Sequence, residues 1–363
     1  MKYIFAGGGS GGHIYPAIAI ADEIRKLDDK AEILFIGAKG RIEEKIVPSN
    51  NYRLETVEIS GINRENIIKN YRLPVKLLTS FRRCLRIIKE FKPDAAIGTG
   101  GFVCGPVIFA AAILKIPTLI QEGNSFAGKT VKFLSGRADK VVINFKETEK
   151  YFRRKDNIIQ IPHPVRSSLK TRDREKSLEE FGLPAGRKTI FVFGGSQGAR
   201  GINSGIEKII RKLCEKNLNV IWQTGKNEFE RLSREFEDLK KSVRILEFID
   251  NIDTAYSASD LVICRAGITS ITELSFLQKP AILIPLPSSA ENHQEMNAQS
   301  LEVRKAAVMI KENEINGKLY EEIMRILTDE RVKAELSENI KQFSDADAAK
   351  KIAEEAIKLI KKR

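Results

Sequence analysis

Apolar residues along this chain occur in short runs that alternate with longer stretches in which they recur at helical spacing. The short runs predict one series of strands at residues 2–6, 32–36, 95–98, 118–121 and 140–143. A second series is predicted at residues 189–193, 219–223, 244–247, 261–264 and 281–284. Such alternation is typical of parallel sheets covered by helices on both faces, and two series predict two α/β domains.

The boundary between the domains is expected near IPHPVR at 161–166, where two prolines flank a histidine. We predict a first domain at 1–163, a second at 164–345, and a final basic amphipathic helix at 346–363 that has no strand of its own. The halves open alike, with FAGGGSGG at 5–12 and FGGSQGAR at 193–200. This favours two Rossmann-like, doubly wound units facing a central cleft, with the ligand where the carboxyl ends of the strands converge.

Composition describes a soluble globular protein, because 42% of the 363 residues are hydrophobic and 30% are charged. No apolar run approaches the roughly 20 residues needed to span a bilayer. Since a strand is predicted from residue 2, no signal peptide is expected. The cysteines are scattered and lack paired metal spacing, so we expect small core residues in a reducing compartment. They are Cys84, Cys104, Cys214 and Cys264.

The net charge of +13 favours an anionic partner, and residues 64–92 carry nine basic side chains against two acidic ones. Two interpretations stay open for this segment. It is an ordinary surface helix with its apolar stripe in the core, or a basic amphipathic surface that contacts anionic lipid. Nucleic acid is not an expected partner, since no aromatic interleaving or recognition motif accompanies the charge. The apolar stripe comprises Val75, Leu78, Phe81, Leu85 and Ile88.

Three glycine-rich loops follow predicted strands, at 7–12, at 98–106 (GTGGFVCGP) and within 193–200. A single loop of this kind is compatible with a plain turn, but three suggest anion binding, because a helix N-terminus offers backbone N–H groups and a positive dipole. In the third loop, Ser196 and the next helix N-terminus are suited to a diphosphate, and Arg166 to a charge-assisted bond. Helix capping and a surface cation are the alternatives.

A second polar cluster follows the predicted strand at 261–264, where CRAGITSITELSF leads into a helix near Thr269. Glu273 is either an acidic residue near the helix start or an acceptor for two ribose hydroxyls. The stretch AENHQEMNA at 290–298 adds His293 and Gln294, which are suited to sugar hydroxyls or form a polar helix start.

His13 follows the first glycine-rich loop at the start of a predicted helix. The positive helix end disfavours the protonated imidazole, so His13 is a candidate general base, with a loop-bonding residue as the alternative. Glu122, at the end of the predicted strand 118–121, is the rival base.

These segments, together with QEGNSFAGK, EFIDNI and ENHQEMNA in this order, resemble the MurG family, the N-acetylglucosaminyltransferases that make lipid II from lipid I in peptidoglycan synthesis. The resemblance implies a GT-B fold, UDP-N-acetylglucosamine as donor, and transfer with inversion to the 4-hydroxyl of the muramoyl sugar of lipid I. It implies a peripheral enzyme on the cytoplasmic face of the cell membrane, a last helix that crosses back onto the first domain, and other cell-wall synthesis proteins as further partners.

The resemblance also implies catalytic roles for His13 and Glu122 and a set of donor contacts. These contacts are Ser10, Gly11, Gly12, Asn124, Arg166, Ser196, Ile249 through its backbone, Ile268, Thr269, Ser270, Glu273 and Gln294. No cofactor and no metal ligand are expected, since DAD at 345–347 is the closest approach to a D-x-D pair and lies in the C-terminal connection.

The chain departs from the family pattern at His163, Gly123 and Ala266, where asparagine, glutamine and serine are usual. We expect these departures to alter local contacts more than the activity. The alternative functions are a GT-B enzyme with another lipid acceptor, such as a diacylglycerol glycosyltransferase, and a UDP-N-acetylglucosamine 2-epimerase. A nucleotide-sensing or membrane-adaptor protein without catalysis is a third.

Overall fold

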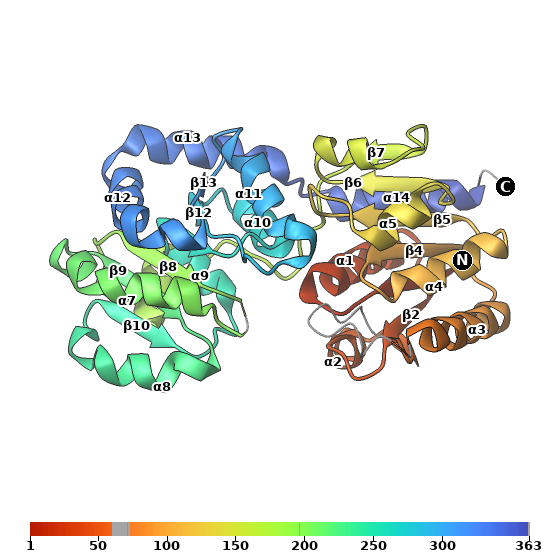
Figure 1. The fold of residues 1–363 in the computed structure, drawn as a ribbon, viewed down its shortest axis with the longest axis horizontal. Helices are drawn as coiled ribbons and strands as arrows, with labels where there is room; N and C mark the ends of the chain where they lie inside the picture. The colour runs from red at the N-terminus through yellow and green to blue at the C-terminus, as the bar shows by residue number, and fades with distance from the viewer. Residues whose placement is uncertain (60–70, 72, 196, 362–363) are drawn as a thin grey trace. The chain divides into compact units, whose positions relative to one another are not determined.

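The computed structural model describes residues 1–59, 71, 73–195 and 197–361, and they form two compact units (Figure 1). The first unit comprises residues 1–167 and 344–363, and the second comprises residues 168–343. The sequence-based boundary after residue 163 lies slightly earlier, because it was placed at the prolines of IPHPVR.

The first unit contains a parallel sheet with the strand order β3-β2-β1-β4-β5-β6-β7. Its strands are β1 (Lys2–Gly7), β2 (Glu32–Ala38), β3 (Arg53–Val57), β4 (Ala95–Gly100), β5 (Thr118–Glu122), β6 (Lys140–Ile143) and β7 (Ile158–Gln160). Its helices are α1 (Gly11–Leu27), α2 (Glu43–Ser49), α3 (Leu73–Phe91), α4 (Cys104–Ile113), α5 (Lys129–Ser135), α14 (Ala348–Lys361) and the 3-10 helix Lys146–Tyr151.

Alternate residues of each strand in this sheet face opposite helical layers, as the two-residue period of a strand requires. In β1, Ile4 packs with α3, α4 and α5, whereas Tyr3 and Phe5 pack with α1 and α14. The last helix therefore belongs to the first unit, where Ile352 is fully buried against the α1 side of the sheet. The continuous apolar runs in the strands follow from this burial on both faces.

The second unit contains a parallel sheet with the order β10-β9-β8-β11-β12-β13. Its strands are β8 (Thr189–Phe193), β9 (Asn219–Gln223), β10 (Val243–Leu246), β11 (Leu261–Cys264), β12 (Ala281–Leu283) and β13 (Val308–Met309). Its α-helices are α6 (Arg174–Glu180), α7 (Arg200–Glu215), α8 (Lys226–Glu235), α9 (Ile252–Ala258), α10 (Ile268–Phe276), α11 (His293–Glu302), α12 (Ile315–Thr328) and α13 (Glu330–Ile340). Its 3-10 helices are Glu237–Leu239, Ala290–Asn292, Glu312–Glu314 and Lys341–Phe343.

The predicted central strands match the structure closely, whereas the sheet edges depart from the prediction. The sequence reasoning missed β3, β7 and β13, and it placed β10 one residue late, at 244–247. All four strands lie at the edges of their sheets, where partial burial does not require a continuous apolar run. The final helix was predicted to reach residue 363, and its last two positions lie outside the described residues.

Helix α3 corrects the interpretation in which its apolar stripe lies wholly in the core. Ile88 is buried, but Val75 is 64% exposed and Leu78 is 51% exposed. The C-terminal part of the stripe therefore packs on the sheet while its N-terminal part faces solvent. Arg64, Lys69 and Arg72 of the basic segment lie outside the described residues. Within the described parts of the chain, no helix is both long and apolar enough to span a membrane.

The predicted core role of the cysteines holds for three of them, since Cys84, Cys104 and Cys264 are buried and Cys214 is partly buried. Burial raises the pKa of the Cys84 and Cys104 thiols to about 12, so both remain protonated and unreactive near neutral pH.

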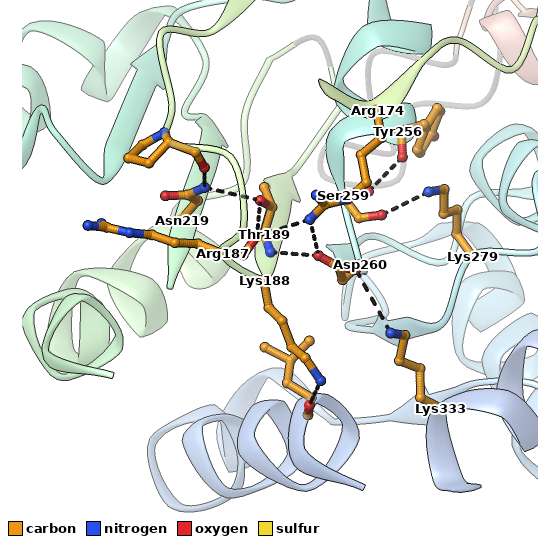
Figure 2. Close-up of polar contacts among 12 residues, drawn as sticks. Arg174, Arg187, Lys188, Thr189, Asn219, Tyr256, Ser259, Asp260, Lys279 and Lys333 are labelled. Atoms are coloured by element: carbon orange, nitrogen blue, oxygen red, sulfur yellow. Dashed lines mark hydrogen bonds and ion pairs between the residues drawn. The ribbon is translucent and has the colours of Figure 1, made fainter. Parts of the chain in front are cut away.

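The amino ends of the central strands in the second sheet are held by a charged network (Figure 2). Asp260 Oδ2 accepts hydrogen bonds from the Thr189 backbone N–H and from Arg174, both at 2.8 Å. Beside it, Lys279 Nζ donates to the Ser259 carbonyl at 2.8 Å, and burial lowers the pKa of Lys279 to about 8. This network joins the starts of β8 and β11, at the opposite strand ends from the glycine-rich loop that follows β8.

Candidate active site

His13 lies in the first turn of α1, directly after the loop that leaves β1, and two hydrogen bonds tie it to the end of β4. Its ring Nδ1 lies 3.0 Å from the Thr99 carbonyl oxygen, and Thr99 Oγ1 donates to the His13 carbonyl oxygen at 2.6 Å. Because a carbonyl oxygen can only accept, Nδ1 is the donor. The lone pair of the neutral imidazole is therefore on Nε2.

Glycines allow the loops after β1 and β4 to pack around this histidine. A Cβ atom on Gly100, whose φ is +106°, would lie 2.6 Å from His13 Nδ1. A Cβ on Gly101 would lie 2.3 Å from the Gly8 carbonyl oxygen, and one on Gly7 would lie 2.0 Å from Thr99 Oγ1. The glycines at 100–101 thus have a packing role that the sequence did not reveal, and anion binding by this loop stays a prediction.

Glu43 on α2 supports the first glycine-rich loop through hydrogen bonds, and the sequence reasoning did not single it out. It is fully buried, and its carboxylate accepts hydrogen bonds from the backbone N–H groups of Ala38 at 3.0 Å and Gly9 at 3.1 Å. A Cβ on Gly8 would lie 2.2 Å from Glu43 Oε1. The pair Glu43–Glu44 looks like an ordinary acidic helix start, so no local signal distinguishes the buried member.

Glu122, the rival base, ends β5 and is buried. Its Oε1 accepts from both the backbone N–H and the side-chain Nδ2 of Asn124 at 3.0 Å, and its Oε2 accepts from the Gly128 N–H at 2.9 Å. These bonds orient Asn124, one of the predicted donor contacts. Glu122 therefore organises the 123–128 loop, and its role as the rival base stays a prediction.

Two of the three departures from the family pattern belong to one buried network. His163 Nδ1 lies 2.8 Å from Gln121 Nε2, and its backbone N–H donates to Asn144 Oδ1 at 3.0 Å. Asn144 Nδ2 in turn donates to the Gly123 carbonyl oxygen at 3.1 Å. Burial, followed by the nearby His13, lowers the pKa of His163 to about 3, so His163 is neutral. Arg166 lies three residues further along the segment that this network anchors.

In the second unit, Gln223 at the end of β9 links two loops of the predicted donor site. Its Nε2 donates to the Gly195 carbonyl oxygen at 3.0 Å, and its Oε1 accepts from the Ile249 N–H at 2.9 Å. A ligand that contacts Ile249 through its backbone therefore meets the carbonyl oxygen. The sequence reasoning missed Gln223, and Ser196 lies outside the described residues.

Glu273 lies in the second turn of α10 and is buried beside Tyr256, whose hydroxyl donates to Glu273 Oε2 at 2.9 Å. The Ile268, Thr269 and Ser270 positions form the first turn of this helix, so their backbone N–H groups point out of its N-terminus. The two features bring a carboxylate and a helix N-terminus to the end of β11. This combination is suited to hydroxyl and anionic groups on one ligand.

Gln294 lies in the first turn of α11 and accepts a hydrogen bond from the Leu286 N–H at 2.9 Å through Oε1. That bond orients its amide so that Nε2 is the group available to donate to a sugar oxygen. Glu291 and Asn292, just before it, have φ values of 57° and 56°, an unusual conformation for residues other than glycine. The departure at Ala266 does not disturb the start of α11, because Asn297 Nδ2 donates to the Ala266 backbone carbonyl oxygen, at 3.2 Å, and this bond needs no side chain.

The structure thus distributes the predicted residues over two groups, one in each unit. Ser10, Gly11, Gly12, His13, Glu122, Asn124 and Arg166 lie in the first unit, and Ile249, Ile268, Thr269, Ser270, Glu273 and Gln294 lie in the second. Across the described ranges, no group of three or more His, Cys, Asp or Glu side chains is arranged to hold a metal ion.

Both halves of the chain match domains of one enzyme family. The glycosyltransferase family 28 N-terminal domain matches residues 3–143, and the C-terminal domain of that family matches residues 189–352. A relative from Flavobacterium psychrophilum is 42% identical over 99% of this chain and 98% of its own length. A relative from Ruminiclostridium cellulolyticum is 40% identical over 97% of this chain and 98% of its own length.

Both relatives are named UDP-N-acetylglucosamine–N-acetylmuramyl-(pentapeptide) pyrophosphoryl-undecaprenol N-acetylglucosamine transferase. The crystal structure of Acinetobacter baumannii MurG is similar with a TM-score of 0.79 at 26% identity, and the match covers 98% of this chain and 99% of that chain. The chain belongs to the MurG family. The resemblance seen in the sequence is confirmed, as are the GT-B fold and the prediction of a glycosyltransferase.

The MurG-family fold by itself does not decide between transfer and epimerisation. A UDP-N-acetylglucosamine 2-epimerase is also similar, with a TM-score of 0.69 at 15% identity. At that identity the likeness shows only the fold. The full-length relatives at 40–42% identity are transferases by name, and they place the chain with N-acetylglucosaminyltransferases rather than with the epimerase.

Proposed function

We propose that this MurG-family chain transfers N-acetylglucosamine from UDP-N-acetylglucosamine to the 4-hydroxyl of the muramoyl sugar of lipid I, giving lipid II. The observation that carries the proposal is the full-length identity of about 40% to relatives named for this transfer. The buried carboxylate and helix N-terminus of the second unit are suited to a UDP-sugar, and the histidine of the first unit is suited to a hydroxyl acceptor.

On this proposal, the reaction is a direct displacement with inversion. The acceptor oxygen forms a bond to C1 of the donor sugar, the bond from C1 to UDP breaks, and UDP leaves with the bonding pair. His13 Nε2 takes the proton of the acceptor hydroxyl, because the hydrogen bond from Nδ1 to Thr99 leaves the lone pair on Nε2. Glu122 supports the site by holding Asn124 in place.

The leaving diphosphate needs positive potential, which this chain can supply without a metal ligand. Arg166 and the helix N-termini that follow the glycine-rich loops are the proposed sources. Glu273, Gln294 and the carbonyl oxygen of Ile249 are the proposed contacts to the hydroxyls and base of the donor. Tyr256 and Gln223 fix two of these contacts by hydrogen bonds.

We also propose that the first unit binds the cytoplasmic face of the membrane through a lipid-contact surface comprising α3, α4 and α5. Val75 and Leu78 of α3 are more than half exposed, and so is Phe133 of α5. The rings of Phe81, Phe109 and Phe133 form a chain with centroid distances of 5.6 Å, so the apolar surface continues from α3 to α5. Basic side chains of α3 lie along the same helix, which is the composition that anionic lipid attracts.

The test of the proposed function is incubation of the protein with radiolabelled UDP-N-acetylglucosamine and purified lipid I. The expected product is a labelled disaccharide lipid, formed together with one UDP per transfer. Label on diacylglycerol but not on lipid I would favour another lipid acceptor, and formation of UDP-N-acetylmannosamine without lipid I would favour an epimerase. Either result would overturn the proposal.

A further inference from the structure

Thr99 is the buried residue that joins the end of β4 to His13, and only 1% of it is exposed. Its carbonyl oxygen accepts from His13 Nδ1 at 3.0 Å, and its hydroxyl donates to the His13 carbonyl oxygen at 2.6 Å. The two bonds run in opposite directions between the same two residues, which lie 86 positions apart in the chain. We propose that Thr99 is a positioning residue that fixes the tautomer and orientation of the His13 imidazole.

An irregularity in the sheet places Thr99 where it can make both contacts. In the pairing of β1 with β4, Ala6 lies opposite Gly98 and Gly7 lies opposite Gly100. Thr99 is therefore the extra residue of a bulge, which re-aims its peptide and side chain toward the start of α1. Gly7 is required for the same contacts, because a Cβ there would lie 2.0 Å from Thr99 Oγ1 and would displace the hydroxyl.

The consequence for catalysis follows from the chemistry of the two partners and rests on the proposed function. The Thr99 carbonyl can only accept, so it selects the imidazole tautomer with hydrogen on Nδ1 and the lone pair on Nε2. When Nε2 takes the acceptor proton, the same carbonyl stabilises the imidazolium through its dipole. The hydrogen bond from the Thr99 hydroxyl to the His13 backbone holds the Thr99 carbonyl oxygen within bonding distance of Nδ1. Loss of the hydroxyl therefore weakens both the preference for one tautomer and the orientation of the ring.

The experiment compares Thr99→Val, which removes the hydroxyl while keeping the shape, with Thr99→Ser, which keeps the hydroxyl. Thr328→Val is the matched control, because Thr328 Oγ1 also donates to a backbone carbonyl, at 2.7 Å, but lies on α12 of the second unit. Thr99→Val is expected to lower kcat by roughly 10–100-fold, the loss typical when the groups that orient metal-bound histidines are removed, with KM for the UDP-sugar unchanged. Thr99→Ser restores most of kcat, and Thr328→Val does not change it.

The second readout is the protonation of the His13 ring, measured from 15N shifts of histidine-labelled protein. Only three histidines are present, so His163→Gln and His293→Gln spectra assign the His13 signals. The wild type is expected to show hydrogen on Nδ1 and an unprotonated Nε2, and Thr99→Val is expected to show a mixture of tautomers. This readout requires no acceptor, so it tests Thr99 even if the chain fails to make lipid II.

Three outcomes would overturn the proposal. The first is a wild-type spectrum with hydrogen on Nε2, which needs no variant and therefore does not depend on whether Thr99→Val folds. The second is a folded Thr99→Val protein with wild-type kcat, since loss of the hydroxyl would then not affect turnover. The third is a folded Thr99→Val protein with reduced kcat but wild-type ring shifts, since the hydroxyl would then act by packing alone.

Discussion

Both units place a glycine-rich loop after the first strand of a parallel sheet, but the space beside the glycines is filled in different ways. In the first unit, a Cβ on Gly8 would meet the Glu43 carboxylate and one on Gly100 would meet the His13 ring. In the second unit, a Cβ on Gly198 would meet the Thr224 carbonyl oxygen, at 2.1 Å. Side chains make most of the close approaches to the glycines of the first unit, with Gly101 against the Gly8 backbone as an exception, whereas backbone atoms make the close approaches to Gly198 in the second.

The difference indicates that similar motifs serve different chemistry. Glycines that make room for side chains allow a reactive group to be buried, bonded and aimed, as His13 is by Thr99. Glycines that bring backbone against backbone leave a surface of peptide groups, which is suited to recognising a ligand. The first unit is therefore expected to control turnover and the second to control donor affinity.

The largest expected effect is that of His13→Ala on turnover. Removing a general base lowers kcat by roughly 10²–10⁴-fold, while UDP affinity should stay nearly unchanged because the proposed donor contacts of the second unit are intact. Steady-state kinetics with saturating lipid I, together with calorimetry of UDP binding, separates the two quantities. If His13→Ala retained near-wild-type turnover and Glu122→Ala did not, the roles of these residues would be exchanged.

The converse change, Glu273→Ala, should reduce donor affinity more than turnover at saturation. Each charge-assisted hydrogen bond to a ribose hydroxyl contributes roughly 1.5–3 kcal/mol, so losing both weakens UDP binding by roughly 10²–10⁴-fold before water compensates. Glu273→Gln is the control for folding, because its amide oxygen still accepts from Tyr256. Unchanged UDP affinity of a folded Glu273→Ala protein, measured by calorimetry, would rule out the ribose contact.

A smaller effect is expected on stability as pH falls, and it tests the buried side-chain network of the first unit. The pKa of His163 is about 3 in the folded chain, against 6.5 when unperturbed, so the unfolded chain takes up a proton first. The free energy of unfolding therefore falls as pH drops from about 6.5 toward 3, by about 2 kcal/mol at pH 5. His13 is the neighbouring titratable group that also lowers the pKa of His163.

Urea unfolding of the wild type and of His163→Gln at pH 7 and pH 5 measures this dependence. The variant should lose less stability between the two pH values, whatever its stability at pH 7. Equal losses would show that His163 does not couple folding to protonation in this range.

The smallest effect is expected at the lipid-contact surface, which neither loop system includes. Arg82→Glu with Arg83→Glu should weaken binding to anionic vesicles, because each basic group near such a surface contributes about 1 kcal/mol. Arg83 already pairs with Glu55 at 3.3 Å, so its share should be the lesser. Sedimentation with phosphatidylglycerol vesicles measures the loss, and Arg234→Glu on α8 is a matched control. Equal binding of the wild type to neutral and anionic vesicles would contradict this proposal.

The sequence predicted the features that depend on local pattern. The central strands are buried on both faces, so their apolar runs are continuous and easily recognised. His13 and Glu273 were singled out because each follows a glycine turn at the start of a helix, and the structure places both there. The edge strand β3, with the sequence RLETV, lacks such a run.

The residues that the sequence did not reveal act over long separations along the chain. Thr99 contacts a residue 86 positions away, Glu43 contacts one 34 positions away, and Gln223 contacts one 26 positions away. Threonine, glutamate and glutamine are common at these kinds of positions for unrelated reasons. Only the order of the strands in each sheet brings these three residues next to the loops that they contact.

The return of α14 to the first unit has a consequence for synthesis of the chain. Ile352 and Ala356 are fully buried on the side of the sheet that α1 covers, beside Ile20. The ribosome makes these residues only after the whole second unit, which at about 5–20 residues per second means a delay of roughly 10–40 seconds. During that interval the nascent first unit exposes an apolar face, which makes it a candidate client for chaperones until its last helix emerges.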